Sequence, residues 1–168
     1  MSMIGEYRRI SLGQLYELQD ALKDNPEAIS EFLDPEESAD ESASKLEIAK
    51  AWHGIEFLLY GNENGPPSPL NIVMGGTEIG DEFGYGPIRY LLPDQVKEVS
   101  RTLNVLDKAE LRKQFDPAAF EAADIYPGGW TVLGPEATFE WLWVRLSAVR
   151  DFFREAAEQG DVMLMYLS

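Results

Sequence analysis

The 168-residue chain contains no cysteine. This absence excludes a disulfide framework, a thiolate nucleophile, and cysteine-based zinc or iron–sulfur sites. Long apolar runs are also missing, and the longest fall short of the ~20 residues that a membrane-spanning helix needs. The opening residues MSMIGEYRRI lack the apolar core of a secretion signal. We therefore expect a cytoplasmic protein that is stabilised by packing alone and does not bind a membrane.

Basic residues are scarce, since 14 Lys and Arg stand against 30 Asp and Glu, for a net charge of −16. Binding to nucleic acid or to an anionic membrane depends on Lys and Arg side chains that neutralise phosphates. The composition therefore argues against both and favours a neutral or basic partner. A hydrophobic content of 45% over this length is sufficient for one domain, residues 1–168, with a real core.

The negative charge is concentrated between Glu17 and Glu47, where eleven acidic residues accompany only Lys23 and Lys45. Within this region, residues 34–43 are mostly small or polar and strongly acidic, which predicts a flexible segment. An acidic run of this kind is usually a solvated face. The alternative is a docking surface that attracts a cationic protein partner. The sequence leaves both interpretations open.

Apolar residues at helical spacing, together with capping residues, predict several helices. Ser11 and Gln14 form a capping box before one helix, and Ser44 and Glu47 form another before a helix that ends near residue 60. The longest helix is expected over Pro135–Gln159 and would be ~36 Å long if straight. Shorter helices are expected to open at Pro26, Pro93, Asp107 and Asp116.

Short strands are predicted over Met3–Ile10, Leu70–Met74 and Ile88–Leu91. The segment Asp161–Leu167 is apolar on both faces, which predicts a strand inside the sheet rather than at its edge. Helices outnumber strands, and the strands are far apart in the sequence. The chain is therefore predicted to be an α/β domain in which a small mixed sheet is covered by helices.

The segment GDEFGYGPIR, residues 80–89, combines three glycines with charged and aromatic side chains, and we expect it to be a loop. Its spacing matches no phosphate-binding motif, and its acidic residues would repel phosphate. Asp81, Glu82, Tyr85 and Arg89 are candidates for the wall of a pocket that holds a small polar ligand. The alternative is a structural loop in which Arg89 pairs with an acid and Tyr85 covers the core.

His53 is the only histidine, and histidine is the commonest general acid or base. Glu56 follows at i+3 on the same expected helix, where it can orient His53 or share a ligand. The alternative is a core or rim histidine with one hydrogen bond. Two ligands from one helix do not make a zinc site, which needs three or more protein ligands. We therefore expect neither a metal nor a cofactor.

Three segments occur together in an order typical of a known family: KAWHGIEFLLYGN over 50–62, GDEFGYGPIRYLLPDQV over 80–96, and IYPGGW over 125–130. With the opening MSMIGEYRRI they extend over nearly the whole chain. The sequence resembles the YfbM-like bacterial family, which is catalogued as a domain of unknown function. The resemblance implies a single α/β domain with helix–sheet–helix layering and no known activity. Members often carry a second histidine where this chain has Glu56, so the resemblance gives no paired-histidine metal site.

These features lead to the hypothesis of a protein-binding module, in particular an immunity-type inhibitor in which a small acidic protein neutralises a basic toxin or enzyme. The alternative is a small-molecule sensor or enzyme that uses His53, Glu56 and residues 80–89. Binding is favoured over catalysis because no catalytic signature accompanies these residues. The candidate binding residues are His53, Glu56, Asp81, Glu82, Tyr85, Arg89, Tyr126 and Trp130.

Overall fold

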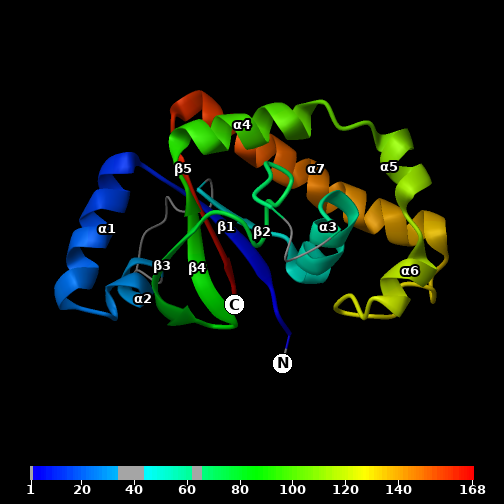
Figure 1. The fold of residues 1–168 in the computed structure, drawn as a ribbon, viewed down its shortest axis with the longest axis horizontal. Helices are drawn as coiled ribbons and strands as arrows, with labels where there is room; N and C mark the ends of the chain where they lie inside the picture. Colours follow the sequence, from blue (N-terminus) through cyan, green and yellow to red (C-terminus); the bar gives the residue numbers. More distant parts are fainter. Residues whose placement is uncertain (1, 34–43, 62–65) are drawn as a thin grey trace.

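The computed structural model describes residues 2–33, 44–61 and 66–168, and within them five strands form one sheet (Figure 1). The strand order is β2-β1-β5-β4-β3. The strands are β1 Gly5–Ile10, β2 Lys45–Glu47, β3 Thr77–Phe83, β4 Gly86–Leu91 and β5 Val162–Leu167. The helices are α1 Leu12–Asp24, α2 Ala28–Leu33, the 3-10 turn η1 Ala49–Ala51, α3 Trp52–Leu59, α4 Pro93–Asn104, α5 Lys108–Gln114, α6 Pro117–Ala122 and α7 Pro135–Gln159.

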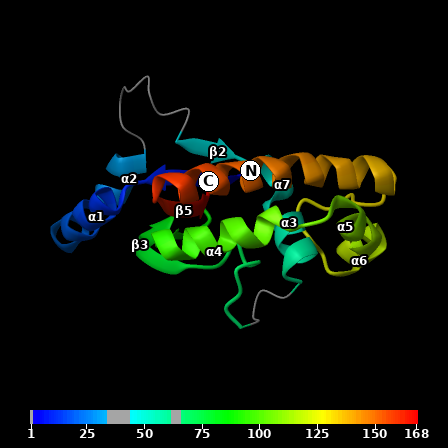
Figure 2. The ribbon, with the colours of Figure 1, turned by 90° about the horizontal axis from the view of Figure 1, so that it is seen from above.

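Helices cover both faces of the sheet, and each face packs against its helices through its own cluster of buried hydrophobic residues. Helices α1 and α2 pack on one face, and α3 to α7 lie on the other, where α4 and α7 run side by side (Figures 1 and 2). Strand β5 contributes to both clusters, because Leu164 faces α1 whereas Met163 and Met165 face α7. The α/β class, the helix–sheet–helix layering and the central position of β5 are confirmed.

One detail of the sheet differs from the prediction of a mixed sheet. Each of the four strand pairs in the described residues is antiparallel. The apolar pattern of a strand reports which faces are buried and not the direction of its neighbours. The direction is therefore set by how the intervening helices return the chain, which the sequence pattern alone does not encode.

Several local predictions are confirmed by hydrogen bonds. The capping box of α1 is present, since Gln14 N donates to Ser11 Oγ at 3.1 Å and Ser11 N donates to Gln14 Oε1 at 2.8 Å. Asp107 accepts from Glu110 N at the start of α5. Helix α7 has the predicted bounds and ends at Gly160. These elements were predictable because each signal depends on neighbouring residues alone.

The capping box predicted at Ser44 and Glu47 is wrong. Residues 45–47 form β2 instead, which pairs with β1 through Tyr7 and Leu46. The helix begins only at η1 and α3. Pairing with a distant strand satisfies the backbone groups of this segment, so a tertiary contact overrides the local helix signal.

The strand predicted over Leu70–Met74 is also wrong, because these residues form turns. Ile72 and Val73 are both buried, whereas a strand would place them on opposite faces. Asn71 stabilises the turn by accepting a hydrogen bond from Met74 N at 3.3 Å.

The expected loop over residues 80–89 is a β-hairpin formed by β3 and β4. A bulge between Ile79 and Glu82 shifts the register, and the turn lies at Gly84 and Tyr85. Gly84 has a φ of +60°. Glycine-rich composition indicates such bulges and tight turns as well as open loops, because both need positive φ. The acidic segment 34–43 lies outside the described residues, and its flexibility stays a prediction.

Candidate functional site

Helix α3 and the 125–130 loop meet through two of the predicted residues. His53 Nδ1 accepts a hydrogen bond from Tyr126 N at 2.9 Å. The Trp52 ring stacks on His53 at 4.9 Å and on Tyr126 at 5.7 Å between ring centroids. Tyr126 also accepts from Met3 N through its hydroxyl oxygen. His53 is half-buried, and its contacts hold the loop against α3. This arrangement agrees with the alternative of a core or rim histidine that has a structural hydrogen bond.

Trp130 is the core anchor of this loop. It is 2% exposed, and its indole Nε1 donates to Ile125 O at 2.7 Å. Its ring contacts Phe120 edge-on at 4.9 Å. Gly54 on α3 makes this packing possible, since a Cβ at that position would lie 2.4 Å from Trp130 Cη2. The loop is therefore fixed on a rigid support.

Glu56 lies in the core at 1% exposure. Its negative charge reaches Tyr7, whose pKa is raised first by burial and further by Glu56. The Tyr7 hydroxyl donates to Ile72 O at 2.9 Å. Glu56 therefore faces the protein interior, and sequence spacing gave no sign of this depth.

An apolar pocket of about 170 Å³ opens beside Trp130 and Trp141. Leu133 lines this pocket and is 76% exposed, and its neighbour in the chain, Val132, is 77% exposed. Val144, one turn after Trp141 on α7, is 56% exposed. We call this surface the tryptophan patch. Its members are Pro127, Val132, Leu133, Trp141 and Val144, and the buried Trp130 lies beneath them. Sequence reasoning named Trp130 but missed Val132 and Leu133, whose only signal was two apolar residues between a turn and Pro135.

The hairpin holds the remaining predicted residues. Asp81 and Glu82 are exposed, and Tyr85 is 40% exposed. Arg89 pairs with Glu78, its partner on β3, at 3.1 Å. Tyr85 N donates to Leu167 O at the end of β5. The structure thus places these residues on the β3–β4 hairpin, on different elements from His53 and Tyr126, and their role in binding stays a prediction.

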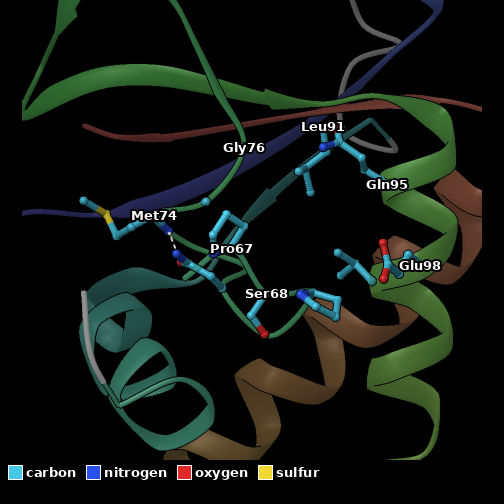
Figure 3. A pocket seen from close by; sticks show the side chains of 11 residues that line it. Pro67, Ser68, Met74, Gly76, Leu91, Gln95 and Glu98 are labelled. Carbon is cyan, nitrogen blue, oxygen red and sulfur yellow. Dashed lines mark hydrogen bonds between the residues drawn. The ribbon is translucent and has the colours of Figure 1, made fainter. Parts of the chain in front are cut away.

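A second, larger cavity of about 370 Å³ separates residues 67–76 from α4 (Figure 3). We call it the α4 cavity. Pro67, Ser68 and Met74 border one side, and Gln95 and Glu98 border the other (Figure 3). The lining residues are Pro67, Ser68, Pro69, Asn71, Met74, Gly75, Gly76, Leu91, Gln95, Glu98 and Val99. This cavity is not predictable from the sequence, because the alternating apolar residues of Leu70–Met74 favour a strand there, whereas the structure has turns.

The described residues contain neither a metal-binding cluster nor a membrane-spanning helix. Among residues 2–33, 44–61 and 66–168, no group of three or more His, Asp or Glu side chains is arranged to hold a metal ion. Over the same part of the chain, no helix has both the length and the apolar character needed to cross a membrane.

The architecture defines an α/β protein with a five-stranded antiparallel sheet between two helical layers. The chain belongs to the family described as a domain of unknown function (DUF1877), which matches residues 1–166. A solved structure described as a protein of unknown function, YfbM from Escherichia coli, is 21% identical with a TM-score of 0.72. The match covers 98% of this chain and 99% of that chain, and it shows a shared fold. No curated protein matches the chain. The family resemblance in the sequence is thereby confirmed.

Proposed function

We propose that the protein is a protein-binding module, in particular an immunity-type inhibitor that docks a basic toxin or enzyme through the tryptophan patch. The observation that carries the proposal is the exposure of Val132 and Leu133 beside an apolar pocket. Contiguous exposed apolar side chains are typical of protein interaction sites.

The size of the pocket favours a protein partner over a small molecule. At about 170 Å³ it lies below the range of roughly 300–1,000 Å³ typical of small-molecule sites. A pocket of that size accommodates one apolar side chain of a partner. Trp141 lines the pocket, and aromatic residues of this kind are enriched at protein interfaces. The support beneath it is rigid, because Trp130 is locked by Phe120 and Ile125. Little ordering is therefore needed on binding.

The charge favours a basic partner. The undescribed residues hold six of the 30 acidic residues and no Lys or Arg, so 24 acidic and 14 basic residues remain in the described part. Most of those basic side chains are already in ion pairs, such as Arg9 with Asp161 and Lys108 with Glu140. Glu121 and Asp124, just before the loop, are exposed. The electrostatic field of this excess negative charge speeds association with a cationic protein.

The sensor or enzyme alternative receives less support, because Glu56 lies in the core and Arg89 is engaged by Glu78. The test uses the full chain as bait in an extract of its host, followed by binding and inhibition measurements with the purified protein that it captures. The double variant Val132→Asp with Leu133→Asp should weaken binding by about 30-fold, which corresponds to ~2 kcal/mol at an interface hot spot.

The control is Val105→Asp, which makes the same chemical change at an apolar residue that is 80% exposed and outside the patch. It should leave the affinity unchanged. Equal loss in both variants would show a general effect of added negative charge, and no loss in the double variant would remove the patch from the interface. Either result contradicts the proposal.

A further inference from the structure

We infer that the α4 cavity binds a small molecule whose charged end is an aliphatic ammonium or guanidinium group. This site is separate from the tryptophan patch and is lined by different residues. Its volume of about 370 Å³ lies within the range typical of small-molecule sites.

The charge of the lining selects a cation. Glu98 is the one charged residue among the eleven that line the cavity. Its side chain extends from α4 toward the cavity (Figure 3). Within the described part of the chain, its carboxylate makes no ion pair with a basic side chain. A cationic ligand would be attracted to this carboxylate, which would repel an anionic ligand.

The amide side chains select a hydrogen-bond acceptor elsewhere on the ligand. Leu92 N donates to Gln95 Oε1 at 2.9 Å, so the oxygen of this amide is engaged. Met74 N engages Asn71 Oδ1 in the same way at 3.3 Å. Each amide therefore keeps its NH₂ group for an acceptor, because the backbone donor fixes which end of the amide faces the main chain.

The apolar lining selects an organic cation over a metal ion. Leu91 and Val99 form part of the wall and are nearly buried, at 6% and 3% exposure. They offer contact to a short aliphatic chain beside the carboxylate. A calcium or magnesium ion needs several oxygen ligands, and a single carboxylate does not supply them.

The test is a titration of the isotope-labelled protein, followed by amide NMR shifts, with three ligands that share one chain: hexylammonium, hexanol and hexanoate. Hexylammonium should bind tightest and should shift amides of residues 67–76 and 91–99. Hexanoate should bind weakest. Equal or tighter binding of hexanoate, or shifts spread evenly over the acidic surface, would overturn the assignment.

Matched variants then test the carboxylate. Glu98→Gln should weaken hexylammonium binding about fivefold and leave hexanol binding unchanged, since only the ion pair is lost. Glu17→Gln is the control, because it removes the same charge from an exposed residue of α1, on the other face of the sheet. An unchanged affinity in Glu98→Gln would refute the site. Tighter binding of the peptide Gly-Lys-Gly than of hexylammonium would assign the cavity to a lysine of another protein and overturn the small-molecule assignment.

Discussion

The 80–89 hairpin and the 125–130 loop have similar compositions but different structural roles. Both combine glycines with aromatic residues, and both were predicted to bind. The hairpin joins the sheet, where Arg89 pairs with Glu78. The loop is anchored by Trp130 and leads to the exposed Val132 and Leu133. Glycine-rich composition therefore indicates backbone positions with positive φ. Whether such a segment joins a sheet or carries an exposed surface depends on the residues that pack against it.

The largest effect is expected from the anchor of the loop. Trp130→Ala should lower the free energy of unfolding by about 3–5 kcal/mol, because it removes a buried aromatic side chain and leaves a cavity. Leu133→Ala should change it by less than about 0.5 kcal/mol, because Leu133 is exposed. Denaturant unfolding measures both. Similar losses in the two variants would remove the distinction between anchor and surface.

The next effect concerns the turn of the hairpin. Gly84→Ala should destabilise the protein by about 1–3 kcal/mol. The residue has a φ of +60°, and an added Cβ would lie 2.4 Å from Leu167 O. Gly13→Ala in α1 is the matched control, since the atom nearest to its added Cβ would be Ser11 Oγ at 3.8 Å. That change should stabilise by roughly 0.5–1 kcal/mol through helix propensity. A tolerated alanine at position 84 would mean that the turn is not held against β5.

A smaller effect is expected at Arg89. This residue best distinguishes the hypothesis of a structural hairpin from that of a hairpin that binds a partner. Arg89→Ala should cost about 1 kcal/mol of stability, through the lost ion pair and the lost packing of its aliphatic stem. Partner affinity should not change. Thermal unfolding and a binding measurement decide the point, and a large loss of affinity at native stability would restore the hairpin as a site.

The smallest effect is the pH dependence at Glu6 on β1, which β5 separates from the hairpin. Burial raises the pKa of Glu6, but hydrogen bonds from Ser168, Lys45 and Tyr166 outweigh burial and leave it lowered. A lowered pKa stabilises the fold above the unfolded pKa, and this contribution is lost as the pH falls through the folded pKa. The stability gap between wild type and Glu6→Gln should therefore shrink below about pH 4. A stability gap that widens at acidic pH would contradict the lowered pKa of Glu6.

The sequence predicted elements whose signals are local and missed those that depend on distant partners. Helix α7 and β5 were found from apolar spacing, and α1 from its capping box. Strand β2 was missed because its pairing with β1 outweighs a helix signal. The candidate binding residues divide in the same way. Tyr126 and Trp130 were identified by residue type, but the exposure of Leu133 follows only from packing.

The most direct test of the account is one comparison of dissociation constants for the captured partner. Wild type, the Val132→Asp with Leu133→Asp variant, and Arg89→Ala would be measured side by side, each shown first to fold. We predict about a 30-fold loss for the double variant and less than about twofold for Arg89→Ala. The reverse order would contradict the account and would place the binding surface on the hairpin.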